Sequence, residues 1–123
     1  MPTATLIVLS DPSGGEESLG RLFNALAAAH DFEQRGQPVQ IVFQGTGTRW
    51  PALLNQSDHP AHALYAAVQH RVAGASLGCA TVFGAKDDVA DAEVRFLSDN
   101  AVPGTPGLSS IAGYAAGGPV ITF

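Results

Sequence analysis

The segment Thr3-Ala4-Thr5-Leu6-Ile7-Val8-Leu9, followed directly by Ser10-Asp11-Pro12-Ser13-Gly14-Gly15, decides the fold. Its first part is a nearly continuous run of apolar and β-branched residues, which is typical of a strand covered on both faces. Its second part is rich in turn-forming residues and ends the strand. The segment therefore predicts a buried strand of a parallel sheet, with a glycine-bearing loop at its carboxyl end.

The rest of the chain alternates in the same way between strand-like and helical patterns. Apolar residues at helical spacing run from Glu16 to Gln34, where Arg35 and Gly36 stop the helix. Further strands are expected at 39–43, 72–79, 94–97 and 119–123, and further helices at 49–54, 60–72, 85–92 and 107–116. This order predicts a three-layer α/β/α domain of flavodoxin-like size, with a five-stranded, mainly parallel sheet. Right-handed crossovers place the loops after the strands on one edge, where ligands of open α/β sheets bind.

Composition limits the classes of function. The 123 residues form one expected domain, 1–123, and a hydrophobic content of 46% is enough for one ordinary core. Six basic and eleven acidic residues give a net charge of -5 without charge runs, which argues against nucleic acid as a partner. No leader pattern and no apolar run approaching the roughly 20 residues of a membrane helix are found. We expect a cytoplasmic protein without a membrane span, and its single cysteine fits a reducing compartment.

The lone cysteine, Cys79, is the candidate catalytic residue, because a free thiol can act as a nucleophile or carry a sulfur atom. If the chain turns from strand to helix at Cys79, the N–H groups of Ala80 to Val82 and the helix dipole would favour its thiolate. The β-branched Thr81 and Val82 equally allow the strand to continue to Phe83. Cys79 would then be a small buried hydrophobic residue. The pattern leaves both interpretations open.

Other residues of the same sheet edge are expected to support a site. They are Ser10, Gly14, Gly15, Gly45, Thr46, Arg49, Ala80 and Thr81. Arg49 is the nearest candidate for a cation beside the thiolate, with a solvated surface arginine as the alternative. The loop from Ser10 to Gly15 leads into a helix and is a possible anion cradle, but it lacks both the dinucleotide fingerprint and the Walker lysine, and Glu16 and Glu17 already satisfy the helix dipole. We interpret it mainly as a turn. Trp50 either lines a pocket or packs in the core.

No metal and no cofactor are expected. Asp58, His59 and His62 are three ligand types within five residues, but Pro60 spreads them around a helix start, and no nearby residues complete a zinc site. Ser109 and Ser110 precede an apolar run and are expected to cap the last helix. Without a nucleophile elbow, hydrolase chemistry has little support.

Several motifs together resemble the DsrE/DsrF-like sulfur-relay family over essentially the whole chain. They are Ser10-Asp11-Pro12 with Gly14-Gly15, Arg21 to Leu26, Phe43 to Trp50, Cys79 to Lys86, and Gly118 to Phe123. The resemblance implies a homotrimer or homohexamer and, in sulfurtransferase members, a persulfide on one cysteine. Cys79 matches that cysteine by its place before Phe83-Gly84. Ser76 stands where some relatives have a second cysteine, so the resemblance supports chemistry on a single thiol only.

Two functions follow as hypotheses. The first is a sulfurtransferase or sulfur carrier that accepts a sulfane sulfur on Cys79 from a donor and passes it to a partner protein's thiol. The alternative is a non-catalytic oligomeric module with a strand-end pocket for a small molecule or anion. Small apolar residues at 25–29 and 112–116 add to the expectation of self-association. Exposure of the Cys79 sulfur separates the two hypotheses, because a carrier must reach another thiol.

Overall fold

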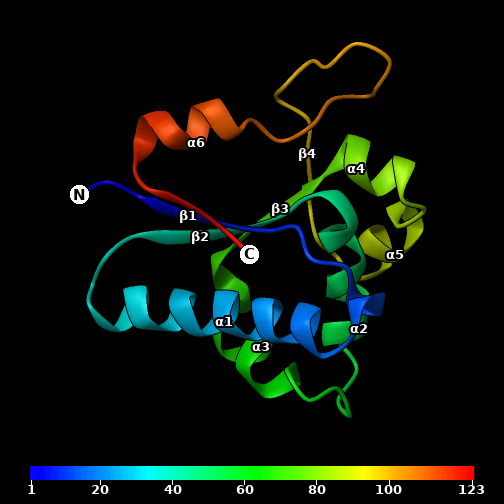
Figure 1. Ribbon diagram of the computed structural model, residues 1–123. Helices are drawn as coiled ribbons and strands as arrows, with labels where there is room; N and C mark the ends of the chain where they lie inside the picture. The colour runs from blue at the N-terminus through cyan, green and yellow to red at the C-terminus, as the bar shows by residue number, and fades with distance from the viewer.

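The computed structural model describes all 123 residues and contains five strands, six α-helices and three short 3-10 helices (Figure 1). The strands are β1 (Ala4–Val8), β2 (Val39–Phe43), β3 (Val72–Ser76), β4 (Phe96–Leu97) and β5 (Val120–Thr122). The α-helices are α1 (Gly15–Gln34), α2 (Trp50–Leu54), α3 (His62–Val68), α4 (Leu77–Val82), α5 (Lys86–Asp91) and α6 (Ile111–Gly117). The 3-10 helices are η1 (Pro12–Gly14), η2 (Gly45–Arg49) and η3 (Gln69–Arg71). None of the α-helices is both long and apolar enough to cross a bilayer.

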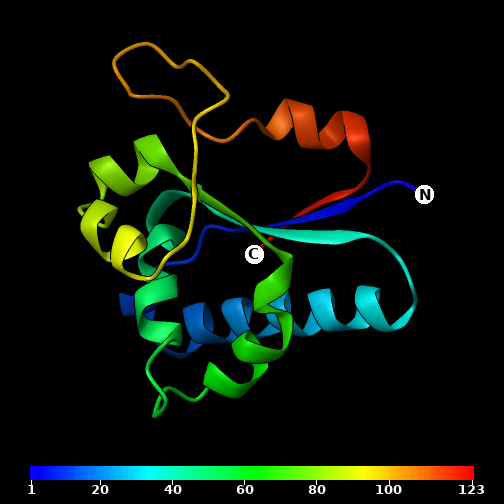
Figure 2. The same ribbon diagram turned by 180° about the vertical axis from the view of Figure 1, so that it is seen from behind.

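All neighbouring strands pair in parallel, in the order β4-β3-β2-β1-β5. The chain steps outward from β1 to β4 and then returns to place β5 on the other side of β1. Because the crossovers are right-handed, the helices that connect β1, β2 and β3 lie on one face of the sheet, and α6, which connects β4 to β5, lies on the other face. Figures 1 and 2 show α1 and α3 on one side of the sheet and α6 on the opposite side. The predicted three-layer α/β/α class is confirmed, and the winding direction reverses between β1 and β5.

Strand β1 is the centre of the core, as its continuous apolar run predicts. All five of its residues are buried. Leu6 and Val8 belong to a cluster of 21 buried residues that also contains Leu22 and Leu26 of α1. Burying one such side chain stabilises the fold by about 1.5–3 kcal/mol. The alternate residues of β1 face α6, and there Thr5 accepts a 2.9 Å hydrogen bond from the Gln40 side chain.

The predicted bounds of several elements are confirmed. Helix α1 starts one residue before the expected Glu16 and ends at Gln34. Gly36 follows it with a φ of +72°, a conformation that favours glycine after a helix. Strand β2 has the expected bounds, and α2 and α5 lie within the expected ranges. Glycine and proline signals therefore located the ends of these elements well.

The helix expected over 60–72 is wrong at both ends. It begins at His62, because the preceding residues form a turn in which the Ala61 N–H donates to Nδ1 of His59. It ends at Val68, where η3 tightens the chain. Val72 then enters the sheet opposite Ile41. The strand expected over 94–97 is also shorter, because the Val94 N–H bonds back to the Val89 carbonyl in the turn after α5.

The strand expected over 72–79 ends at Ser76, and α4 follows directly. The cause is a close approach at Gly78, whose N–H donates to the Gly107 carbonyl at 2.8 Å. A Cβ at Gly78 would lie 2.4 Å from Cδ1 of Leu108. The helix expected from residue 107 begins only at Ile111, because a bridge between Asn100 and Leu108 holds the preceding segment extended.

Candidate functional site

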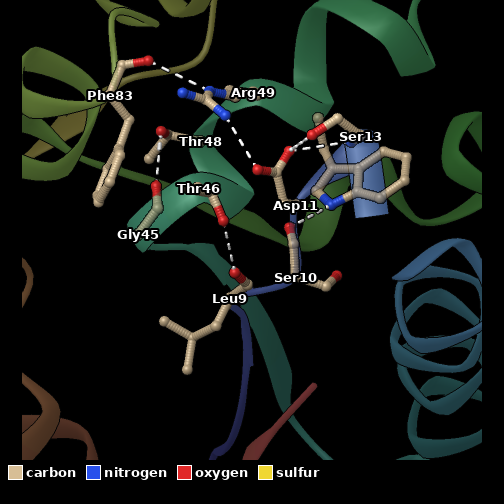
Figure 3. A network of polar contacts seen from close by, with 10 residues as sticks. Leu9, Ser10, Asp11, Ser13, Gly45, Thr46, Thr48, Arg49 and Phe83 are labelled. Carbon is tan, nitrogen blue, oxygen red and sulfur yellow. Dashed lines mark hydrogen bonds and ion pairs between the residues drawn. The ribbon is translucent and has the colours of Figure 1, made fainter. Parts of the chain in front are cut away.

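The loops after β1 and β2 interlock at the carboxyl edge of the sheet (Figure 3). The Thr46 hydroxyl donates to the Leu9 carbonyl at 3.0 Å, and Nε1 of Trp50 donates to the Ser10 carbonyl at 2.8 Å. Gly45 has a φ of +59°, and its carbonyl accepts a 2.8 Å bond from the Thr48 hydroxyl. Thr46 and Trp50 therefore hold the two loops together, and Gly45 shapes the loop after β2. Trp50 is 1% exposed, which places it in the core.

Arg49 joins three segments of this edge. Its guanidinium donates to the Asp11 carboxylate at 3.0 Å and to the Phe83 carbonyl at 3.2 Å, and it lies 5.8 Å from the centre of the Phe83 ring. The N–H and hydroxyl of Ser13 lower the pKa of Asp11, and Arg49 lowers it further. No hydrogen bond joins Arg49 to Cys79. Its guanidinium therefore binds Asp11 and the carboxyl end of α4, which the sequence did not predict.

Cys79 is the third residue of α4, so the chain turns from strand to helix two residues before it. Helical geometry commits the N–H groups of Thr81 and Val82 to carbonyls one turn earlier, so they do not face the sulfur as expected. The Thr81 hydroxyl also donates to the Leu77 carbonyl. Cys79 is 8% exposed and lines none of the five cavities of the molecule. Ala80, beside it, is fully buried in the core.

A buried polar cluster behind α4 was missed by the sequence analysis. The Ser109 hydroxyl donates to Oε1 of Gln44 at 2.9 Å, and the Ser109 N–H lies 3.4 Å from Oγ of Ser76. The expectation that Ser109 caps α6 is therefore wrong, whereas Ser110 does cap it by accepting from the Gly113 N–H. The signal available in the sequence was a polar residue at the end of each of two buried strands, Gln44 after β2 and Ser76 in β3. The cluster fixes the segment before α6 over the start of α4.

Two cavities open at this edge. The first, which we call the switch-point cavity, measures about 340 Å³ and is lined by Leu9, Ser10, Glu17, Ser18, Arg21, Thr122 and Phe123. The second, the Arg49 cavity, measures about 380 Å³ and includes Asp11, Ser13, Gln56 and Asp88 in its lining. Of the predicted supporting residues, Ser10 lines the first and Arg49 the second. Gly14, Gly15, Gly45, Thr46, Ala80 and Thr81 line neither.

Ser10 is the distinctive residue of the switch-point cavity. Its Oγ is buried and has no hydrogen-bond partner. Figure 3 shows this hydroxyl turned away from Arg49, toward the side on which α1 lies. The cavity lies beside the carboxyl ends of β1 and β5, where the winding of the sheet reverses. Ligands of open α/β sheets bind at such topological switch points.

The histidines near Pro60 make local contacts. Nδ1 of His59 accepts from the Ala61 N–H, and Nδ1 of His62 lies 2.7 Å from the Leu54 carbonyl. No three His, Cys, Asp or Glu side chains of the chain are grouped so as to hold a metal ion.

Comparisons with models of protein families, with curated proteins and with solved structures return no match. The class of the protein is therefore defined by its fold and by the site at the strand ends. It is a three-layer α/β protein with a parallel sheet and a cavity at the reversal of the sheet.

Proposed function

We propose that the protein is a non-catalytic binding module that holds a small molecule or anion in the switch-point cavity. The observation that carries this proposal is the buried Ser10 hydroxyl without a partner. Burying a hydroxyl without a hydrogen bond costs about 1–3 kcal/mol. Rotation of the Ser10 side chain toward the cavity would let a ligand oxygen satisfy this group. The sheet reversal beside the cavity places the hydroxyl where ligands of this architecture bind.

The chemistry of the lining selects a ligand with hydrogen-bond acceptors. Helix α1 starts at this cavity, and no side chain caps its first N–H groups. Arg21 adds a cation, although it is also paired with Glu17 at 2.6 Å. The Glu17 carboxylate opposes a dense negative charge, so a carboxylate or a sugar-like hydroxyl group suits the cavity better than a multiply charged phosphate.

Replacing Ser10 with alanine is expected to have two effects of opposite sign. The empty protein should gain about 1 kcal/mol in its free energy of unfolding, because an unsatisfied buried hydroxyl is removed. Binding of acetate, glycerol or inorganic phosphate, screened by calorimetry, should weaken about threefold to tenfold for whichever probe the wild type binds. Ser57→Ala, on an exposed turn, is the control and should change neither quantity. A Ser10→Ala protein that is less stable, or that binds the probe unchanged, would count against the proposal.

Sulfur carriage on Cys79 is the second candidate function. The observation in its favour is that Cys79 lies on the first turn of a helix at the carboxyl edge, where the helix dipole favours an anion. The thiolate would attack the outer sulfur of a donor persulfide, forming a persulfide on Cys79 and releasing the donor thiolate. An acceptor protein's thiolate would then take that sulfur and leave the Cys79 thiolate. This exchange needs no cofactor, and it suits a cytoplasmic protein, whose thiols stay reduced.

The near burial of Cys79 is why sulfur carriage comes second. If this candidate is right, incubation with a small persulfide donor should add one sulfur atom per chain, and reduction should remove it. Cys79→Ser should add none while keeping the wild-type circular dichroism spectrum. Intact-protein mass spectrometry measures both. A wild type that takes up no sulfur, or a serine variant that takes up as much, would exclude Cys79 as a carrier.

Self-association is part of the proposal for either function, with the homotrimer or homohexamer of the resembled family as the expected form. Helix α6 has no buried residue, and its Ile111 is 44% exposed. Strand β5 is a free sheet edge, on which Ile121 is 39% exposed. The small residues at 25–29 contribute less than expected, because Ala25, Leu26 and Ala29 pack in the chain's own core. We therefore place the contact on α6 and β5.

Light scattering should give a mass well above the 12.6 kDa of one chain. Ile121→Lys should reduce the mass toward that of the monomer, because a charge on an apolar contact is costly to bury. Val82→Lys, at a residue that is 68% exposed on α4, is the control and should leave the mass unchanged. A wild-type monomer would refute self-association, and an unaffected Ile121→Lys assembly would refute this contact.

A further inference from the structure

The largest cavity of the molecule, about 660 Å³, lies on the α6 face of the sheet and separate from the strand-end cavities. We call it the α6-face cavity. It is lined by Gln40, Ala73, Arg95, Phe96, Leu97, Ser98, Asp99 and Tyr114. It exists because α6 is only seven residues long and contacts β1 and β5, so that no helix covers the same face of β3 and β4 (Figure 2). Its volume is within the range of roughly 300–1,000 Å³ typical of small-molecule sites.

Two opposite charges flank β4 at this cavity. Arg95 directly precedes the strand, and Asp99 follows it after one intervening residue. Neither takes part in any ion pair or side-chain hydrogen bond within the chain. Gly74 makes room for the arginine, since a Cβ there would lie 3.1 Å from Cγ of Arg95. The cavity therefore presents a free cation and a free anion on the same wall.

Two further polar groups complete this wall. The Gln40 amide nitrogen donates to Thr5, which leaves the amide oxygen of Gln40 without a bond. The hydroxyl of Tyr114 on α6 has no hydrogen-bond partner. Burial and then the negative charge of Asp99 raise the pKa of Tyr114, and Arg95 lowers it, so both charges act at this hydroxyl. Tyr114 stays protonated at neutral pH and is available as a donor.

We infer that the α6-face cavity binds a small zwitterion with an apolar side group, as an apolar α-amino acid or its dipeptide presents. Its carboxylate pairs with Arg95 and accepts from the Tyr114 hydroxyl. Its ammonium group pairs with Asp99 and donates to the Gln40 amide oxygen. The half-buried Leu97 supplies an apolar contact for the side group. A simple anion would meet Asp99 and a simple cation would meet Arg95, so the paired charges favour a ligand that has both.

Calorimetric titration with L-leucine and with the dipeptide Leu-Leu tests this inference. At least one of them should bind at millimolar concentration or better. N-acetyl-leucine, which lacks the cation, and leucinamide, which lacks the anion, should each bind at least about tenfold more weakly. Failure of both zwitterions to bind, or equal binding of either singly charged analogue, overturns the inference.

Variants of the two charges locate the site. Asp99→Asn keeps the size of its side chain, and Arg95→Gln keeps a polar but shorter one; each should weaken zwitterion binding about tenfold or more. Arg35→Gln, which alters an exposed arginine at the end of α1, should have no effect. Thermal melting of each variant verifies the fold, and because Arg95 and Asp99 are exposed, the melting temperatures should stay near the wild-type value. Wild-type affinity in folded Arg95→Gln would place the ligand elsewhere and overturn the assignment. These results are independent of the switch-point cavity, where no residue is changed.

Discussion

Gly47→Ala is expected to cost at least about 3 kcal/mol of the free energy of unfolding. A Cβ at Gly47 would lie 2.0 Å from the Val8 carbonyl oxygen and 2.8 Å from the Val8 carbonyl carbon. Both are backbone atoms of the central strand, so neither can rotate away as a side chain would. The loop after β2 would have to move off β1, which would break the interlock between the two loops. Because small domains are stable by only about 5–15 kcal/mol, much of the variant should be unfolded in mild denaturant.

Gly20→Ala provides the matched control, because it is the same substitution in the same chain. Gly20 lies within α1, and a Cβ there would have nothing within 4 Å. Alanine in a helix is favoured over glycine by roughly 0.5–1 kcal/mol, so this variant should be slightly more stable than the wild type. Urea unfolding followed by circular dichroism compares the three proteins. Equal midpoints for Gly47→Ala and the wild type would mean that the loop after β2 does not approach β1 so closely.

The sequence predicted the parts of the fold that depend on local patterns. The apolar run of β1 and the spacing of α1, ended by Gly36, were sufficient because burial and helix termination act over a few residues. The start of α4 was not predicted, because it depends on contacts of Gly78 with Gly107 and Leu108, about thirty residues later. Residues 77–79 have a strand-like composition, but packing against a distant segment makes them helical.

The sequence predicted where the loops of the candidate residues lie, but not the contacts that those residues make. Parallel topology was enough to bring the loops of Ser10, Arg49 and Cys79 to one edge. It could not tell that Arg49 pairs with Asp11, because side-chain partners depend on the detailed path of each loop. The exposure of the Cys79 sulfur also depends on residues far away in the sequence, because the segment before α6 packs over the start of α4. The unpartnered Ser10 hydroxyl has no sequence signature at all, because serine is an ordinary turn residue.

Trp50→Ala is expected to lower the free energy of unfolding by about 3–5 kcal/mol. Trp50 is 1% exposed, and it is the largest buried side chain of the core. Its removal leaves a cavity under α2 and also deprives the Ser10 carbonyl of its 2.8 Å hydrogen bond. Trp50→Phe separates the cost of the cavity from the cost of the lost hydrogen bond. It fills most of the volume, so it should cost less than the alanine variant, with the unpaired carbonyl contributing about 1–3 kcal/mol.

The control for Trp50 is Phe23→Ala, which removes an aromatic side chain that is 44% exposed on α1. Because its ring is largely in water in the folded state, its removal should cost less than half as much as that of Trp50. Urea unfolding measured by circular dichroism is the appropriate assay, since both tryptophan variants lack the only indole of the chain. Equal losses for Phe23→Ala and Trp50→Ala would show that Trp50 does not anchor α2 to the loop after β1.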